Sequence, residues 1–168
     1  MKYLLFVFLF VSSISFSASG ELSCGSIECD DFIADTSNLA SLQDGLTTYM
    51  NYCYGCHSLQ YSRYNRIAKD LKIPLELYEQ HLIFDGSKPG ELMKISMKTK
   101  DAVNWIGANP PDLTLEARIR KPSWIYTYLR KFYPDASRPY GVNNEVYSNV
   151  SMPHVLEDLQ SSLTENDF

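Results

Sequence analysis

The sequence has 168 residues, 20 of them acidic and 15 basic, which gives a formal net charge of −5. Hydrophobic residues make up 45% and charged residues 21%, which excludes a disordered or collagen-like chain and provides enough apolar side chains for one folded domain. The negative charge argues against a nucleic-acid binder, and a single long apolar run excludes a protein with several membrane spans.

Residues 1–20 have the pattern of a secretory signal peptide. Lys2 precedes an apolar run from Tyr3 to Val11, and small residues follow up to Gly20. We expect cleavage after Ser19 or Gly20. A retained membrane anchor is the alternative, although about nine unbroken apolar residues are fewer than the roughly 20 that span a bilayer. Export would bring the chain into an oxidising compartment, which permits disulfides and haem attachment.

Two cysteines, Cys24 and Cys29, lie just beyond the predicted cleavage site. We favour a local disulfide between them, with two free thiols as the alternative. Lipidation of Cys24 is disfavoured because Glu21 stands where a lipoprotein signal has an aliphatic residue.

A helix is predicted from Ser41 to the second pair of cysteines. Ser41 and Asp44 are typical of a helix N-terminus. Gly45 favours a second helix that crosses closely at this point. Apolar residues recur at helical spacing along one face of the segment: Leu42, Leu46, Tyr49, Met50 and Cys53.

The helix leads into Cys53-Tyr54-Gly55-Cys56-His57, a C-x-x-C-H motif typical of covalent haem c attachment. Two thiols at this spacing can each reach one vinyl group of the haem, and the adjacent histidine can bind the haem iron as its proximal ligand. In a cytosolic chain the same spacing would indicate a thioredoxin-like dithiol or half of a zinc site. Export and the lack of a second C-x-x-C favour haem.

The rest of the sequence also indicates a mainly α fold, because no run of residues alternates between apolar and polar side chains as a half-buried strand does. An apolar stripe on the last of these helices fits either a core face or the wall of a cofactor site. The predicted elements are a helix from Pro74 to about Phe84, a turn over 85–90, short helical pieces at 91–97 and 101–106, a helix from Pro122 with the stripe Trp124, Ile125, Tyr128, Leu129 and Phe132, and a long loop over 134–153.

Haem iron bound by His57 needs a sixth ligand or an open site. Met152 is the leading candidate because it lies in a late loop, next to small residues and Pro153. His154 is the alternative, and His81 is a weaker one. Met50, Met93 and Met97 lie on helical patterns and fit packing roles better.

Several blocks in order resemble cytochrome c1, the haem subunit of bacterial ubiquinol–cytochrome c reductase (the cytochrome bc1 complex). The resemblance covers roughly residues 36–160. It rests on Ser41-Leu42-Gln43-Asp44-Gly45, Asn51 through Tyr61, Arg63-Tyr64-Asn65-Arg66, Pro110-Pro111-Asp112-Leu113 with Arg118 and Arg120, and Gly141-Val142-Asn143-Asn144 through Asn149-Val150-Ser151-Met152-Pro153-His154-Val155-Leu156.

The resemblance implies one haem c, bound through thioethers to Cys53 and Cys56, with His57 and Met152 as axial ligands of the iron. It implies that Arg120 binds a haem propionate, with a solvated surface charge as the alternative for Arg120 and for Arg118 alike, and that the turn at Pro111 lines the haem crevice.

The resemblance also implies a function and partners. Cytochrome c1 takes one electron from the Rieske iron–sulfur protein and passes it to a soluble cytochrome c, beside cytochrome b, at the periplasmic face of the cytoplasmic membrane. The chain would then be an electron carrier within an enzyme complex, with no catalytic residues of its own and with membrane association through the complex. An acidic surface would attract a basic cytochrome c.

The sequence departs from the family pattern after Met152, where only 16 residues follow. We therefore expect a cytochrome c-like domain with long loops that lacks the family's C-terminal helix and membrane anchor. The predicted organisation is a signal peptide (1–20), a lead segment (21–40), a cytochrome c1-like haem c domain (41–160) and a polar tail (161–168). The alternatives are a non-functional truncated remnant and a periplasmic thiol–disulfide oxidoreductase that uses Cys53 and Cys56.

Overall fold

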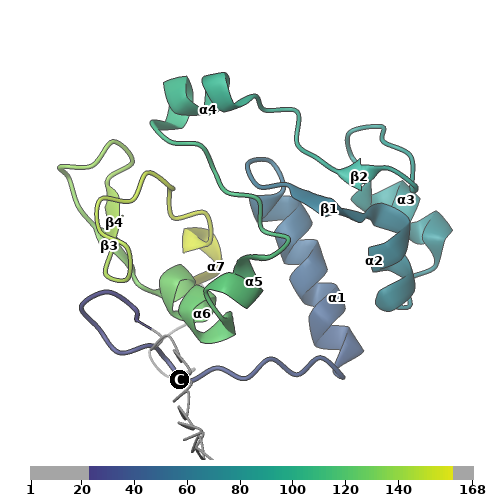
Figure 1. The fold of residues 1–168 in the computed structure, drawn as a ribbon, viewed down its shortest axis with the longest axis horizontal. Coiled ribbons are helices and arrows are strands. Elements are labelled where there is room, and N and C mark those ends of the chain that lie inside the picture. The colour runs from purple at the N-terminus through teal and green to yellow at the C-terminus, as the bar shows by residue number, and fades with distance from the viewer. Residues whose placement is uncertain (1–22, 161–168) are drawn as a thin grey trace, which may run out of the picture.

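The computed structural model describes residues 23–160 as short helices with two small antiparallel sheets (Figure 1), which confirms the mainly α prediction. The predicted signal peptide and polar tail lie outside the described residues. Within residues 23–160, no helix has the length and apolarity needed to cross a membrane. The elements are α1 (Leu39–Thr48), the π-helical turn η1 (Tyr49–Cys53), β1 (Leu59–Arg63), α2 (Tyr64–Asp70), α3 (Leu75–Leu82), β2 (Leu92–Met93), α4 (Thr99–Ile106), α5 (Glu116–Ile119), α6 (Pro122–Arg130), β3 (Phe132–Pro134), β4 (Val142–Asn144) and α7 (Glu157–Gln160).

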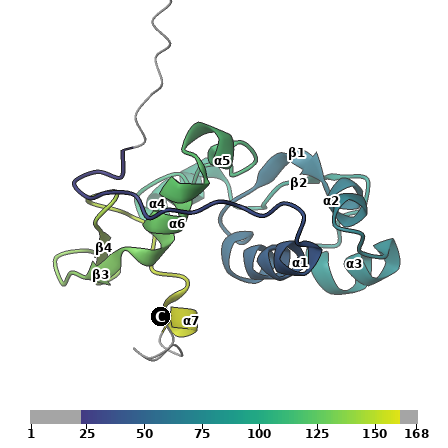
Figure 2. The ribbon, with the colours of Figure 1, turned by 90° about the horizontal axis from the view of Figure 1, so that it is seen from below.

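The helix α1 separates two sides of the fold, and both ribbon views show the division (Figures 1 and 2). α2, α3, β1 and β2 lie on one side of α1, and α5, α6, β3, β4 and α7 lie on the other. The chain crosses between the two sides from β2 to α4 (Figures 1 and 2). After α4 the backbone amide of Leu113 donates to the carbonyl of Ser58 at 2.9 Å, so the segment between α4 and α5 lies directly beside the end of the C-x-x-C-H motif.

The α1 helix begins earlier than the sequence predicts. Asn38, rather than Ser41, is the cap: its side chain accepts a hydrogen bond from the Ser41 amide at 3.2 Å. The helix continues without a break into η1, which ends at Cys53. Gly45 is exposed, and a Cβ atom built on it would meet nothing within 4 Å. The close crossing predicted at Gly45 is therefore not formed by residues 23–160.

The predicted α3, α4 and α6 helices are confirmed. Pro74 is the cap of α3, and Pro122 is the first residue of α6. Two further four-residue helices, α5 and α7, and the seven-residue α2 were not predicted. Helices this short contain too few apolar repeats to show a period in the sequence.

Two predictions about irregular and helical segments are wrong. Residues 91–97, predicted as helical, contain β2, which pairs antiparallel with β1 so that Leu59 lies opposite Met93. Residues 134–153, predicted as a loop, contain β4, which pairs with β3 so that Phe132 lies opposite Asn144. Strands of two to five residues have no clear alternation of their own, so pairing with another strand decides their structure.

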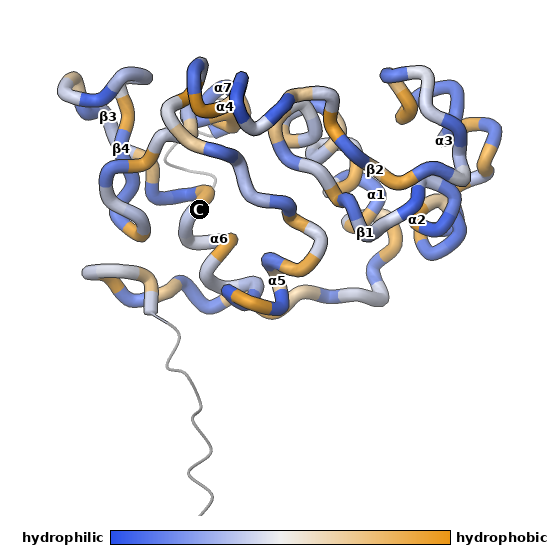
Figure 3. Tube along the Cα trace, turned by 45° about the horizontal axis from the view of Figure 1, so that its top comes forward, coloured by the Kyte–Doolittle hydropathy of each residue, from blue (hydrophilic) through white to orange (hydrophobic). Residues whose placement is uncertain are grey.

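The buried hydrophobic cluster of the described residues lies on one side of α1. Hydrophobic residues occur on both sides (Figure 3), but the buried cluster joins α1 and η1 to α2, α3 and β2. On the other side, the only buried residue of α6 is Thr127. The core cluster consists of Leu46, Met50, Tyr54, Tyr64, Ala68, Tyr78 and Met93.

Candidate haem-binding site

The C-x-x-C-H motif lies at the end of η1, where the helix turns back on itself. The amides of Cys56 and His57 both donate to the carbonyl of Cys53, at 3.0 and 2.9 Å. This turn leaves Cys53 half-buried and Cys56 exposed, both with free thiols, and it places His57 at 9% exposure. Two free thiols on a tight turn next to a buried imidazole are the arrangement that covalent haem attachment requires.

The imidazole of His57 is fixed by a hydrogen bond from its Nδ1 to the carbonyl of Pro111 at 2.8 Å. A carbonyl only accepts, so Nδ1 carries the proton and Nε2 keeps its lone pair free for a metal. The hydroxyl of Tyr49 donates to the His57 carbonyl at 2.6 Å and fixes the backbone as well. Both the orientation and the tautomer of His57 therefore suit an axial ligand of iron.

The Pro111 turn is itself fastened to the segment after the motif. The Oδ2 atom of Asp112 accepts a hydrogen bond from the Gln60 amide at 2.7 Å, and its Oδ1 accepts from the Thr114 amide at 3.1 Å. These contacts hold the Pro111 carbonyl against His57 although the two residues are remote in sequence.

Met152 lies half-buried in the loop after β4, and its sulfur contacts α6. The hydroxyl of Tyr128 donates to the Met152 Sδ atom at 3.4 Å. Burial raises the pKa of Tyr128 to about 12, so the phenol remains protonated and can donate at neutral pH. The carbonyls of Asn149 and Val150 accept hydrogen bonds from Arg138 at 2.7 and 2.9 Å, which hold the loop just before Met152.

Two buried asparagines organise the same loop. The Oδ1 atom of Asn143 accepts from the amide of Asn149 at 2.9 Å. Asn144 is 1% exposed; its Oδ1 accepts from the Val146 amide at 2.9 Å, and its Nδ2 donates to the Tyr128 carbonyl at 2.7 Å. The Met152 loop and α6 are thereby joined through one side chain.

Arg120 and Arg118 both lie on the exposed surface at the end of α5. The Arg120 guanidinium lies over the ring of Trp124 at 4.4 Å, and its Nε forms an ion pair with Glu116 at 3.1 Å. The stacking fixes the guanidinium plane beside α6, while some of its N–H groups remain free for a carboxylate.

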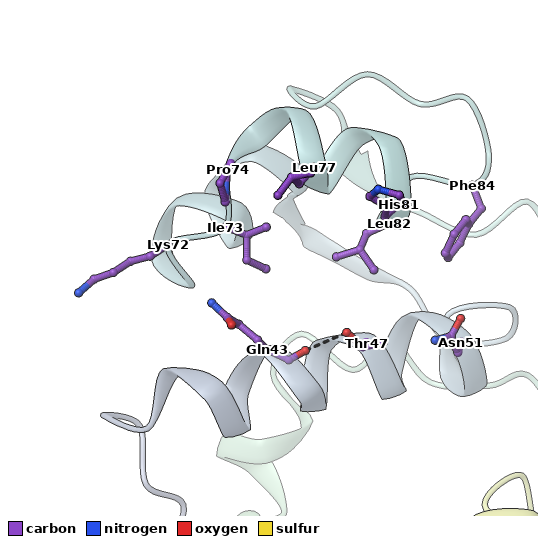
Figure 4. A pocket seen from close by; sticks show the side chains of 10 residues that line it. All are labelled: Gln43, Thr47, Asn51, Lys72, Ile73, Pro74, Leu77, His81, Leu82 and Phe84. Atoms are coloured by element: carbon purple, nitrogen blue, oxygen red, sulfur yellow. Dashed lines mark hydrogen bonds between the residues drawn. The ribbon is translucent and has the colours of Figure 1, made fainter.

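Of the two alternative ligands, His154 lies at the Phe132 end of the aromatic stripe and His81 lies elsewhere. The Nε2 atom of His154 is 2.9 Å from Gln160 Oε1, and its ring stacks on Phe132. His81 belongs to an open groove of about 440 Å³ between α1 and α3 (Figure 4). That groove contains none of Cys53, Cys56, His57, Met152, Arg120 and Pro111. Its lining consists of Gln43, Thr47, Asn51, Lys72, Ile73, Pro74, Leu77, His81, Leu82 and Phe84.

The apolar surface of α6 fits a flat, apolar cofactor. The predicted stripe of Trp124, Ile125, Tyr128, Leu129 and Phe132 is half-buried throughout, although its residues are among the largest in the chain. Trp124 stacks on Tyr128 at 5.1 Å between ring centres, and Tyr128 meets Phe132 at 5.4 Å. A large aromatic face left half-covered, with a thioether beside Tyr128 and a guanidinium over Trp124, can accept a haem.

The blocks noted in the sequence lead to a specific relative. No family model matches the chain. A curated cytochrome c1 of Allochromatium vinosum is 50% identical over 159 residues, which are 95% of this chain and 64% of that protein. This chain is cytochrome c1-like. An ammonia monooxygenase gamma subunit of Nitrosomonas europaea is 38% identical over 160 residues, which are 95% of this chain and 66% of that protein. The cytochrome c1-like chain thus spans slightly less than two thirds of the length of both relatives.

Sequence reasoning missed the residues that hold the candidate ligands in place. Tyr49, Tyr128, Asn143 and Asn144 act through hydrogen bonds to residues outside their own helix or strand, and the local sequence pattern does not show these bonds. Asn143 and Asn144 were predicted to lie in the long loop over 134–153. Burial of their amides is the property that distinguishes them, and it is visible only in the fold.

Proposed function

We propose that this cytochrome c1-like chain carries one haem c and transfers single electrons. Cys53 and Cys56 would attach the haem by thioether bonds, and His57 and Met152 would bind the iron. The observation that carries the proposal is the His57 imidazole, which the Pro111 carbonyl fixes with its Nε2 free, one residue from a free thiol. The haem supplies the redox change, while the protein fixes its ligands and limits access of water.

Within that function, Arg120 would bind a haem propionate, and Pro111 would form part of the crevice wall. The guanidinium is exposed beside the aromatic stripe of α6, where a carboxylate could replace the contact with Glu116. The Tyr128 hydroxyl would orient the sulfur of Met152. A thioether ligand raises a haem potential, which suits an acceptor late in an electron-transfer chain.

We further propose the partners of a cytochrome bc1 complex: a Rieske protein as donor, a soluble cytochrome c as acceptor, and cytochrome b as the membrane neighbour at the periplasmic face. Charge supports a basic acceptor, because residues 23–58 contain five acidic residues and no lysine or arginine. Most of these acids are exposed, and rising salt should slow the reaction with a basic cytochrome c. The acidic residues are Glu28, Asp30, Asp31, Asp35 and Asp44.

The test is expression of the chain with a cytochrome c maturation system. We expect a haem-staining band on a denaturing gel and a low-spin spectrum, both lost in the Cys53→Ser/Cys56→Ser variant. Met152→Ala should keep the attached haem but lower its midpoint potential, by a sizeable part of the roughly 0.8 V over which axial ligands set haem potentials. Met97→Ala is the matched control, because Met97 is also half-buried. Absence of attached haem would refute the proposal.

Two observations bear on other functions. Burial, followed by the neighbouring Cys56 thiol, raises the pKa of Cys53, whereas a thiol–disulfide oxidoreductase needs a cysteine with a lowered pKa. An oxygenase role, as in the name of the second relative, would need an open position on the iron. If the Met152→Ala variant kept the wild-type spectrum, Met152 would not be a ligand of the iron. That result would count against electron transfer through a His/Met haem.

A further inference from the structure

The cysteine pair near the N-terminus has no part in the proposed haem site, yet it is well packed. Cys24 and Cys29 form a disulfide, as predicted, and Cys24 is 1% exposed. The hairpin between them lies against the backbone of the loop after β4: a Cβ atom on Gly25 would meet the Val146 carbonyl oxygen at 2.7 Å. Gly25 also has a φ of +72°, a region that favours glycine. The disulfide therefore closes a loop shaped to fit this surface.

The chain that follows the hairpin is fastened to α6. We call residues 24–32 the N-terminal strap; the ribbon views show this part of the chain running along the outer side of α6 (Figures 1 and 2). The amide of Asp30 donates to Thr127 Oγ1 at 2.8 Å, and its carboxylate pairs with Arg130 at 3.1 Å. Phe32 stacks on Tyr126 with ring centres 4.6 Å apart. Thr127 is fully buried, so the strap covers the only buried position of α6.

The strap thus touches the two elements that hold Met152. One is α6, whose Tyr128 donates to the methionine sulfur. The other is the loop after β4, where Val146 is bound to Asn144 and Asn144 is bound to the Tyr128 carbonyl. The strap therefore contacts both elements, and Met152 contacts one of them through the Tyr128 hydroxyl.

We propose that the N-terminal strap, closed by the Cys24–Cys29 disulfide, is a positioning element for Met152. It holds α6 and the loop after β4 together, so that the thioether stays next to the Tyr128 hydroxyl. Opening the disulfide frees the hairpin from Val146 and loosens the methionine side. Cys53, Cys56 and His57 lie at the end of η1 and make no contact with the strap among the described hydrogen bonds, so haem attachment continues.

The proposal rests on the proposed function for the role of Met152, and its test separates the two. The Cys24→Ser/Cys29→Ser variant of the full chain is compared with wild type, with and without haem. We expect hydrogen exchange to become roughly tenfold faster, or more, in α6 and residues 143–150, with α2 unchanged. In the haem-loaded chain, the methionine–iron absorption band should weaken and the midpoint potential should fall, while haem staining stays the same. A dithiol reductant added to wild type should have the same effects.

Further variants keep the test decisive if the double cysteine variant folds poorly. Thr127→Val removes the acceptor for the Asp30 amide and should loosen α6 and the loop without touching the disulfide, whereas Thr127→Ser should restore protection. Asp31→Asn is the matched control, because Asp31 is exposed in the strap and makes no hydrogen bond within the described part of the chain.

The possible outcomes are distinct. Exchange that is unchanged in α6 and the loop, or equally accelerated in α2, overturns the positioning role. The same holds if the methionine band and potential are unchanged after the disulfide is lost. A wild-type chain without haem refutes the proposed function instead, and exchange in that chain still decides whether the strap holds the Met152 loop.

Discussion

Asn144 offers the sharpest test of how the Met152 loop is held. Asn144 is 1% exposed, and its side chain forms three hydrogen bonds. Its Oδ1 accepts from the Val146 amide at 2.9 Å and from the Tyr147 amide at 3.3 Å, and its Nδ2 donates to the Tyr128 carbonyl at 2.7 Å. Asn144→Ala leaves three backbone groups without these partners. At about 1 kcal/mol for each net hydrogen bond, the free energy of unfolding should fall by roughly 3 kcal/mol. That is a large part of the roughly 5–15 kcal/mol that stabilises a typical domain.

Urea unfolding followed by circular dichroism measures this loss, provided that wild type and variant have the same slope. Asn104→Ala is the control: Asn104 is exposed on α4, and within residues 23–160 its side chain makes no hydrogen bond. Its unfolding free energy should change by less than about 0.5 kcal/mol. If Asn144→Ala lowers the free energy of unfolding by less than about 1 kcal/mol, water replaces the lost hydrogen bonds, and this asparagine does not hold the loop.

Two other predictions concern pH and the Pro111 turn. Burial raises the pKa of Tyr78 to about 12; because the folded value exceeds the ordinary 10.0, its stabilising effect is complete below pH 10 and is lost as pH rises toward 12. Absorbance of tyrosinate should therefore rise in a late step together with loss of circular dichroism, and complete ionisation near pH 10 in the folded chain would contradict this. Asp112→Ala removes the bonds to the Gln60 and Thr114 amides and should lower the unfolding free energy by about 2 kcal/mol. The Asp112→Ala chain should also bind haem with a shifted potential, and an unchanged potential would show that Pro111 keeps its place without them.

Local signals predicted the four longest α-helices of the described residues, α1, α3, α4 and α6. Pro74 and Pro122 mark helix starts because proline fits the beginning of a helix and not its interior, and both helices are present. The start of α1 was misplaced because Asn38 and Ser41 are both good caps, and only the fold shows which one is used. The strands were missed because they are only two to five residues long, and because β1 gains its hydrogen bonds from a partner distant in sequence, with Leu59 opposite Met93.

The candidate site could be predicted as a set of residues but not as an arrangement. Cys53, Cys56 and His57 follow one another, so their relation is local. The bond between His57 and the Pro111 carbonyl, by contrast, joins residues 54 positions apart. A backbone carbonyl carries no sequence signal, and only the turn around Asp112 decides where it lies. The contact of the Tyr128 hydroxyl with the Met152 sulfur also joins residues that are distant in sequence, here 24 positions apart.

The two faces of α6 explain why an N-terminal strap is needed at all. The strap binds Ser123, Tyr126, Thr127 and Arg130, whose spacing of three and four residues places them on one face of the helix. The aromatic stripe that begins at Trp124 occupies the opposite face and remains half-buried. The buried core cluster ends on the other side of α1, so it cannot hold α6 in place. A helix that keeps its apolar face free for a cofactor must be fixed from behind, and the disulfide-closed strap provides that support.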